Sequence, residues 1–283
     1  MDKKEDQAIL DWVALYDYGS LHPYHLRRRR PGTGQWLFET NAFKLWLAGE
    51  HGSLLCRGMP GAGKTILAAV VVDNLLAHRG ADNCNSTTGV AFLYCSFLQG
   101  ETPTLEDLLL SVLRHLSEGL PSLPESVRRL YQTHHAAKTR PPLGDIVSCL
   151  GSTIDQYKRT FIIVDALDEC PSGCLRWLLK TLFHLRDAHG ANLFATSRPH
   201  HEIEARFFKD SVLEINANPA DVRQYLDTHM SGLPMFVRSQ RDLREMVKEV
   251  IVAAVCSIFL LVQLYLRYVQ VFILSVTLAM PCC

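Results

Sequence analysis

One short segment, residues 58–65, constrains this chain more than any other. It reads Gly-Met-Pro-Gly-Ala-Gly-Lys-Thr and matches G-x-x-x-x-G-K-[ST], a loop that cradles nucleotide phosphates. Glycine can adopt positive φ and bring backbone N–H groups against phosphate oxygens, because it has no Cβ in the way. The pattern therefore predicts a phosphate-binding loop made of Gly58, Met59, Pro60, Gly61, Ala62, Gly63, Lys64, Thr65 and Ile66.

The sequence around this loop favours a functional match. Residues 53–57 form a short apolar run that suits a buried strand, and residues 65–76 predict a helix whose N-terminal dipole faces the phosphates. Strand, loop and helix thus follow in the required order, which makes an unrelated glycine-rich turn the weaker interpretation. In this arrangement Lys64 is expected at the β- and γ-phosphates, and the Thr65 hydroxyl is a candidate Mg²⁺ ligand.

A second informative segment is residues 160–170, Thr-Phe-Ile-Ile-Val-Asp-Ala-Leu-Asp-Glu-Cys. Four apolar residues followed by Asp165 predict a central parallel strand whose carboxyl end lies beside the loop, where Asp165 would reach Mg²⁺. Asp168 and Glu169 follow at the strand exit, where a carboxylate can orient or deprotonate an attacking water. We expect Glu169 to be the base and Asp168 to assist on the metal side. The alternative, that these acids only cap the next helix, is weakened by the intervening Pro-Ser-Gly.

A third segment adds a positive charge at the same edge. Residues 192–196 form an apolar strand, and Ser197-Arg198-Pro199 ends it. Because Arg198 follows a strand expected next to the phosphate loop, it is a candidate for contacting the γ-phosphate. Further strands are expected at 90–97 and 212–215, and helices at 39–47, 104–116, 125–135 and 175–187. The fold class is therefore α/β with a parallel sheet.

Composition narrows the choice of partners and compartment. The chain has 283 residues with 29 basic and 29 acidic side chains, so no overall field favours nucleic acid and none is expected as a partner. Several of the nine cysteines lie in apolar runs, where cysteine behaves as a small hydrophobe. No secretory signal opens the sequence, and we expect a reduced, cytoplasmic protein.

The two ends of the chain carry different patterns. Residues 1–35 are expected to be a partly helical lead-in and linker, in which the basic run 27–30 favours a solvated linker over a nucleic-acid or localisation signal. Residues 250–280 are strongly apolar. Two interpretations stay open for this tail: a buried helix over 250–266 followed by a divergent end, which is favoured, or a membrane-inserting helix. Without a partner domain, such a surface would be exposed and prone to association.

Taken together, these segments resemble the NACHT branch of the STAND P-loop NTPases, in particular nephrocystin-3-like N-terminal modules of filamentous fungi. The resemblance extends from about residue 9 to about residue 266. It is carried by five blocks, at residues 31–37, 58–65, 162–170, 196–198 and 221–226.

The resemblance implies a three-layer P-loop NTPase sandwich with strand order 5-1-4-3-2 and a C-terminal helical lid. The expected division is a lead-in at 1–35, the NTPase domain at 36–216, a lid at 217–266 and an apolar tail at 267–283. It also implies an ATP-biased or GTP-using switch with Mg²⁺ and slow hydrolysis. In such signalling proteins, related to innate immunity and often joined to repeats, diphosphate holds the closed state and triphosphate allows self-association or partner binding.

The chain departs from the family pattern in three respects. No effector domain is recognisable upstream, and the winged-helix part and repeats that usually follow the lid are missing. The lid motif, usually Gly-x-Phe-Leu-Trp-like, reads Ser-Ile-Phe-Leu-Leu at residues 257–261, without the glycine and tryptophan. Two further functions therefore stay open: a truncated nucleotide-binding scaffold or decoy without turnover, and a membrane-attached NTPase.

Overall fold

The computed structural model describes residues 3–14, 16, 18–81, 88–95, 103–171, 173–207, 211–233, 235–255 and 258–279. Parts of three predicted segments lie outside these residues: the last two residues of the strand predicted at 90–97, the first residue of the lid motif and the end of the apolar tail. Among the described elements, at least one helix separates each strand from the next.

The strands are β1 (Ser53–Arg57), β2 (Thr88–Tyr94), β3 (Arg159–Asp165), β4 (Ala191–Ser197) and β5 (Ser211–Glu214). The helices up to β5 are α1 (Lys3–Val13), α2 (Tyr18–Arg28), α3 (Trp36–Glu39), α4 (Asn41–Ala48), α5 (Lys64–Ala81), α6 (Leu105–Glu118), α7 (Glu125–Ala137), α8 (Leu143–Ile154), the 3₁₀ turn η2 (Leu167–Glu169), α9 (Leu175–His189) and α10 (His201–Phe207). After β5 come α11 (Pro219–His229), η3 (Met230–Gly232), α12 (Met235–Ser239), α13 (Arg241–Val255) and α14 (Phe259–Ala279).

The five strands form one parallel sheet in the order β2-β3-β4-β1-β5. This is the predicted order 5-1-4-3-2 read from the opposite edge, so the prediction is confirmed. The three middle strands read as near-continuous apolar runs because both of their faces are buried, as every residue of β4 is. Since all strands are parallel, their carboxyl ends lie at one edge of the sheet.

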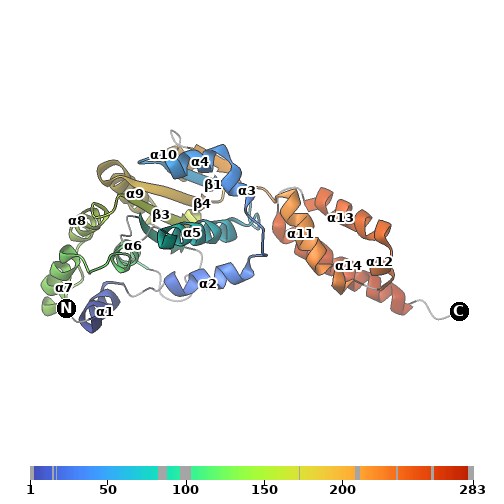
Figure 1. Ribbon diagram of the computed structural model, residues 1–283, viewed down its shortest axis with the longest axis horizontal. Helices are drawn as coiled ribbons and strands as arrows, with labels where there is room; N and C mark the ends of the chain where they lie inside the picture. The colour runs from blue at the N-terminus through green and yellow to red at the C-terminus, as the bar shows by residue number, and fades with distance from the viewer. Residues whose placement is uncertain are drawn as a thin grey trace.

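Helices cover both faces of the sheet and make it the middle of three layers. Figure 1 shows α5 and α2 on one side and α4 and α10 on the other. Helix α5 packs on β2, β3 and β4, whereas α4 packs on β1 and β5. Trp46 of α4 shows why this packing holds: its ring lies 5.3 Å from Phe161 and 5.5 Å from Phe194, both on the central strands.

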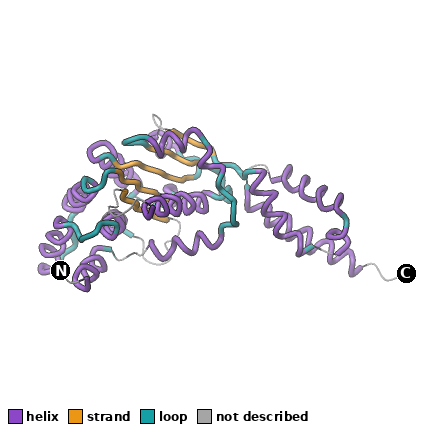
Figure 2. The backbone as a smooth tube through the Cα atoms, in the orientation of Figure 1, coloured by secondary structure: helices purple, strands orange, loops and turns teal. Residues whose placement is uncertain are grey.

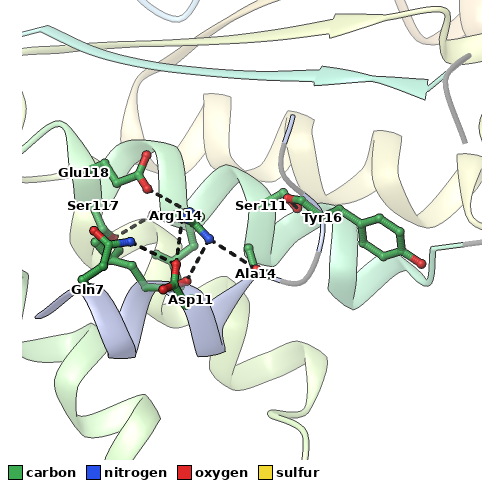
Figure 3. Close-up of polar contacts among 10 residues, drawn as sticks. Gln7, Asp11, Ala14, Tyr16, Ser111, Arg114, Ser117 and Glu118 are labelled. Atoms are coloured by element: carbon green, nitrogen blue, oxygen red, sulfur yellow. Dashed lines mark hydrogen bonds and ion pairs between the residues drawn. The ribbon is translucent and has the colours of Figure 1, made fainter. Parts of the chain in front are cut away.

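The N-terminal lead-in is packed against the body of the fold. Ile9, Val13 and Tyr18 are buried in the same hydrophobic cluster as the sheet. Figure 3 shows how Arg114 of α6 fastens α1: its guanidinium lies 3.0 Å from Asp11 Oδ1 and donates to the carbonyls of Leu10 and Ala14 at 3.5 Å. The Leu10 carbonyl also accepts from the Ala14 N–H at 3.3 Å, so Arg114 adds its contacts where α1 ends.

The C-terminal helices form a second hydrophobic cluster, built from residues between Ala217 and Leu266. Figure 2 shows α11, α13 and α14 extending away from the sheet as a group of helices. The apolar run at 250–266 does not form the single helix expected from the sequence. Helix α13 ends at Val255, Ile258 lies outside either helix, and α14 starts at Phe259. Among the described residues, we find no helix with the length and apolarity needed to cross a membrane.

Candidate functional site

The predicted phosphate loop is a tight turn between β1 and α5. Gly61 and Gly63 have φ values of +79° and +97°, in the left-handed region that favours glycine. A Cβ on Gly63 would have nothing within 4 Å, so the backbone there borders open space. At Gly58, in contrast, a Cβ would lie 2.5 Å from the Ile215 carbonyl oxygen. The loop thus needs glycine for conformation at two positions and for close packing at a third.

Lys64 opens helix α5 and folds back over its own loop. Its Nζ donates to the Gly58 carbonyl at 2.7 Å and to the Met59 carbonyl at 3.0 Å. Burial lowers the pKa of Lys64, and the nearby carboxylates of Asp168 and Asp165 oppose that shift. The ammonium is therefore held at the mouth of the loop, within the field of the acidic residues. The Met59 side chain points to solvent and is 49% exposed.

Asp165 lies at the carboxyl end of β3 and is fully buried. Burial raises its pKa to about 6, and hydrogen bonds from Thr196 and Thr65 oppose the shift. Its Oδ1 accepts from Thr196 Oγ1 at 2.5 Å. Its Oδ2 is buried and has no hydrogen-bond partner among the described residues. A buried carboxylate oxygen without a partner, beside the hydroxyl of Thr65, is the donor set that suits a hard divalent cation such as Mg²⁺. The residues present fit this metal.

Thr196 is a positioning residue that the sequence analysis named only as part of a motif. Its hydroxyl accepts from the Ala166 N–H at 2.9 Å while donating to Asp165. Ala166 itself has φ +57°, an unusual value for a residue with a Cβ. This left-handed residue turns the chain sharply out of β3 into η2, which carries Asp168 and Glu169. No local sequence signal identifies a left-handed alanine.

Arg198 joins the two acids of η2. Its backbone N–H donates to Asp168 Oδ1 at 2.9 Å, and its Nε lies 3.4 Å from Asp168 Oδ2. Its Nη2 also donates to Glu169 Oε1. The Asp168 side chain is only 9% exposed, whereas that of Glu169 is 34% exposed. The arginine expected to contact a phosphate thus pairs with both candidate catalytic acids, a contact the sequence analysis did not anticipate.

These side chains surround one cavity of about 460 Å³ at the carboxyl edge of the sheet. The predicted residues that line it are Pro60, Gly61, Gly63, Lys64, Thr65, Ile66, Asp165, Asp168, Glu169 and Arg198. Gly58, Met59 and Ala62 build the loop without lining this cavity. The structure therefore brings together residues that are up to about 140 positions apart in the sequence, while the role of each stays a prediction.

A second, narrower cavity of about 120 Å³ adjoins the first. The two share the residues Arg28, Gly63, Ile66, Phe259 and Gln263. Its other walls include Trp36, Ala62 and Tyr225. The sequence analysis missed this cavity because its walls combine the phosphate loop with segments before β1 and after β5. The basic run taken as a solvated linker is part of it: Arg28, Arg29 and Arg30 all line the cavity.

Specific contacts hold these flanking segments together. Asp221 Oδ2 accepts from the Gly34 N–H at 2.8 Å, and Gln224 Nε2 donates to the Pro31 carbonyl at 2.7 Å. Burial raises the pKa of Asp221, and the Gly34 hydrogen bond opposes this shift. The guanidinium of Arg30 lies 5.6 Å from the centre of the Tyr225 ring, within the range of a cation–π interaction. The two blocks at 31–37 and 221–226 therefore meet at the second cavity.

Helix α14 contacts the phosphate loop directly. The Leu260 N–H donates to the Gly61 carbonyl at 3.1 Å. A Cβ added to Gly61 would lie 2.8 Å from Leu260 Cβ and 3.0 Å from Ile258 Cγ2. Because Leu260 is in the first turn of α14, its N–H has no partner within the helix, and the loop carbonyl provides one. This contact ties the first turn of α14 to the phosphate loop.

His25 of α2 is a further cavity residue that the sequence analysis missed. Its ring centre lies 4.5 Å from that of Tyr94. Burial lowers the pKa of His25 to about 4, with smaller contributions from Arg28 and His22. At neutral pH this side chain therefore presents a neutral imidazole to the cavity.

Solved structures with a similar chain course include a Walker-type ATPase, a replication initiator and DNA-bound Orc1. The Aeropyrum pernix Orc1 protein in complex with DNA is 15% identical and gives a TM-score of 0.46, with 93% of this chain and 63% of that chain covered. A Walker-type ATPase of Pyrococcus abyssi is 13% identical and gives a TM-score of 0.46, with 78% of this chain and 62% of that chain covered. AMPPCP-bound DnaA from Aquifex aeolicus is 9% identical and gives a TM-score of 0.43, with 87% of this chain and 63% of that chain covered. This chain spans less than two thirds of each of the three.

Comparison by sequence gives a family. No curated protein matches the chain. The profile of the family described as nephrocystin 3, N-terminal, matches residues 32–198. This match includes the phosphate loop, the acidic strand and the arginine that ends β4, and it spans more than half of the 283 residues. The fold is that of a P-loop NTPase, and the chain belongs to the nephrocystin 3 N-terminal family.

Proposed function

We propose that this chain binds a nucleoside triphosphate with Mg²⁺ and hydrolyses it slowly, acting as a NACHT-type switch. The observation that carries the proposal is the convergence of Lys64, Asp165 and Arg198 on one cavity at the carboxyl edge of the sheet. Each comes from a different strand end, and the charges are those that a triphosphate and its metal need. ATP is the expected nucleotide, and GTP is the alternative.

The phosphate loop supplies the first part of this function. The N–H groups around Gly61 and Gly63 and the dipole of α5 favour negative charge at the loop. Lys64 is held by two loop carbonyls in the free chain. On binding, we expect its ammonium to exchange these carbonyls for the β- and γ-phosphate oxygens. Such charge-assisted hydrogen bonds are worth about 1.5–3 kcal/mol each.

Thr65 and Asp165 would hold Mg²⁺. When bound, the metal neutralises charge on the β- and γ-phosphates. Thr65 is among the groups that lower the pKa of Asp165, and both residues line the same cavity. Asp165 Oδ2 has room for a new partner, and Thr196 fixes the orientation of the carboxylate through Oδ1.

Hydrolysis requires a carboxylate that can accept a proton from water. Glu169 remains the preferred base because its side chain is more exposed than that of Asp168, which is held by the Arg198 N–H. Arg198 pairs with both acids in the free chain. A γ-phosphate would compete for this arginine and release Glu169 to bind water. That exchange would link nucleotide binding to activation of the catalytic base, Glu169.

The second cavity is the proposed site for the nucleobase and sugar of the nucleotide. It adjoins Gly63 and Ile66 and is walled by Trp36, Tyr225 and Phe259, which offer faces for stacking. Nucleotide in both cavities would touch the sheet, the residues before β1 and the C-terminal helices at once. A ligand that binds one arrangement of these parts better than another shifts their populations, which is how such a switch would release surfaces for self-association or partner domains.

A second candidate function is a nucleotide-binding scaffold without turnover. The observation that favours it is the ion pair between Arg198 and Glu169. If nucleotide does not break this pair, the base stays occupied and binding proceeds without hydrolysis. Both candidates share the phosphate loop and differ only at η2.

Hydrolysis measured alongside binding separates the two. We expect slow phosphate release by the intact chain, and a fall of about 100-fold or more in Glu169→Gln, with nucleotide affinity kept. The matched control is Glu125→Gln, an exposed acid on α7. Undetectable turnover in a folded chain that binds Mg·ATP would favour the scaffold, and no binding at all would reject both.

A further inference from the structure

Arg28 is the only charged residue, in the part of the chain that the structure describes, that lines both cavities of the candidate site. The other four residues that the two cavities share are a glycine, an isoleucine, a phenylalanine and a glutamine. Arg28 is the last residue of α2 and precedes the family match, which begins at residue 32. A positive side chain from outside the matched region therefore lies at the junction between the larger cavity and the second cavity.

Helix α2 is fixed against the sheet, so Arg28 does not belong to a loose linker. The helix packs on α5 and on β2. The Nδ1 atom of His22 lies 2.9 Å from the Tyr94 hydroxyl oxygen, and the ring centre of His25 lies 4.5 Å from that of Tyr94. Both histidines are buried. The last turn of α2 is thereby held beside the helix that follows the phosphate loop.

The next two arginines of the basic run are held by the protein itself. Arg29 Nε donates to the Thr33 carbonyl at 3.0 Å. Arg30 Nη2 lies 2.7 Å from His229 Nε2, and the same guanidinium faces the Tyr225 ring. These two side chains therefore brace the segments that flank the NTPase core.

The Arg28 guanidinium contacts only a ring of its own helix. It lies 5.7 Å from the centre of the Tyr24 ring. Within the described ranges we find no hydrogen bond and no ion pair for it, and the residue is exposed. Lys64 and Arg198, which are also cations of the larger cavity, are in contrast held by loop carbonyls and by the acids of η2. An anion can thus reach Arg28 without displacing a polar partner.

A nucleotide that spans both cavities has its α-phosphate at their junction. In loops of this kind the N–H groups cradle the α- and β-phosphates, and the lysine reaches the β- and γ-phosphates. Gly63 and Ile66, at the end of the loop and in the first turn of α5, line both cavities. The α-phosphate joins the terminal phosphates to the sugar, and a guanidinium can bind phosphate oxygens through two parallel N–H donors.

We propose that Arg28 binds the α-phosphate of the nucleotide, an inference that rests on the proposed function. Nucleoside diphosphates and triphosphates both carry this group, so Arg28 contributes equally to the binding of each and does not sense the γ-phosphate. The contact attaches α2 to the bound nucleotide in either state. The basic run at 27–30 therefore includes a ligand-binding residue as well as residues that brace the flanking segments.

Calorimetric titration of the intact chain with Mg·ATP and with Mg·ADP tests this contact. Arg28→Gln should weaken both by the same factor, roughly 10- to 100-fold. Arg28→Lys keeps the charge without the paired donors and should recover part of the loss. The matched control is Arg27→Gln, because Arg27 lies in the same last turn of α2 and lines neither cavity. Its affinities should equal those of the wild type.

Three results of this titration would overturn the proposal. A loss for ATP alone would place the arginine at the γ-phosphate. Equal losses in Arg28→Gln and Arg27→Gln would reduce the effect to the overall charge of the helix end. Unchanged affinities in Arg28→Gln, with normal binding by the wild type, would reject the role of Arg28 and leave the proposed function standing. A wild-type chain that binds neither nucleotide would reject both.

Sulfur substitution at the α-phosphate locates the contact more directly. Replacing either non-bridging α-oxygen of ATP by sulfur gives two diastereomers, and sulfur accepts hydrogen bonds less well than oxygen. We expect the two diastereomers to bind the wild type with different affinities, and this difference to shrink in Arg28→Gln because the two changes act on one contact. The same difference in both chains would show that Arg28 does not touch the α-phosphate.

Discussion

The two hydrophobic clusters of this molecule differ in how they are held. The cluster around the sheet buries residues of β1 to β4 and contains most of the large fully buried side chains, such as Phe161, Phe194 and Leu54. The C-terminal cluster is smaller, and its helices leave large apolar side chains on the surface, including Met246 at 60%, Val250 at 62% and Tyr268 at 64% exposed. Both candidate cavities have walls from both parts.

This difference indicates where a bound nucleotide could change the arrangement of the two clusters. The sheet cluster is internally complete and can fix Asp165, Thr196 and the phosphate loop. The C-terminal helices depend on a few polar links to the residues before β1, such as Asp221 to Gly34, and on the contact of Leu260 with Gly61. A ligand at the junction can alter those few links at low cost while the sheet stays unchanged. The exposed apolar surface is also a surface that such a movement could cover or present.

The largest effect is expected from a cavity in the sheet cluster. Phe194 is fully buried on β4, and Phe194→Ala should lower the free energy of unfolding by about 3–5 kcal/mol. Leu226 is its counterpart in the C-terminal cluster. Leu226→Ala should speed amide exchange in α11 and α13 while β3 and β4 keep their protection. Equal loss of protection in both clusters would show that they unfold as one unit and would remove the contrast.

The next largest effect on stability is expected at Asp165, and it depends on pH. Its folded pKa of about 6 lies above its ordinary value of 3.8, so the folded state binds more protons between these pH values. Ionised Asp165 therefore destabilises the free chain at pH 7, by up to about 3 kcal/mol, and this cost disappears as the pH falls below about 4. The change in the free energy of unfolding caused by Asp165→Asn should therefore be more favourable at pH 7 than at pH 4. Chemical denaturation at both values measures this, and a difference independent of pH would contradict it.

Thr196 sharpens the account of how the sheet orients Asp165. Thr196→Val keeps the shape but leaves the Ala166 N–H and Asp165 Oδ1 without their partner, at a cost of about 1–3 kcal/mol. The control is Thr153→Val, a fully buried threonine whose hydroxyl donates to the Cys149 carbonyl within helix α8. Thr153→Val should have a smaller effect because the Cys149 carbonyl can still accept a hydrogen bond from the helix backbone. Similar losses in the two variants would argue against a special role for Thr196.

Much of the sheet cluster could be predicted because its signals are local. Parallel strands buried on both faces are apolar runs, and the residues that end them must meet at one edge, which is why Lys64, Asp165 and Arg198 were expected together. The roles of those residues remain predictions. The turn into η2 could not be predicted, because a left-handed Ala166 and the Thr196 bridge depend on contacts between strands.

The C-terminal part was predicted less well for a related reason. An apolar run without glycine or proline gives no sign of a break, so 250–266 was expected to be one helix. Helix α14 instead starts at Phe259, and its first turn makes a tertiary contact that no local pattern shows, the hydrogen bond from the Leu260 N–H to the Gly61 carbonyl. The second cavity was missed in the same way, since its walls at Arg30, Trp36 and Tyr225 are far apart in the sequence and are joined only in the fold.

The smallest expected effect probes the contact between the two parts. Gly61→Ala places a Cβ 2.8 Å from Leu260 Cβ at a φ of +79°, which should cost about 1–2 kcal/mol and displace the start of α14. Exchange of the Leu260 amide should quicken. Gly144→Ala, where a Cβ has nothing within 4 Å, is the control and should be neutral or slightly stabilising. A protected Leu260 amide in Gly61→Ala would show that the helix start does not depend on the loop.

Calorimetric titration of the intact chain with ATP, ADP and GTP in the presence of Mg²⁺ tests the central claim most directly. We predict that the wild type binds at least one triphosphate, and that Lys64→Ala weakens this binding by roughly 10- to 150-fold, the equivalent of about 1.5–3 kcal/mol. Lys158→Ala, which removes an exposed lysine before β3, should leave the affinity unchanged. A folded wild-type chain that binds none of the three, or equal affinities in the wild type and Lys64→Ala, would contradict the assignment of this sheet edge as a nucleotide site.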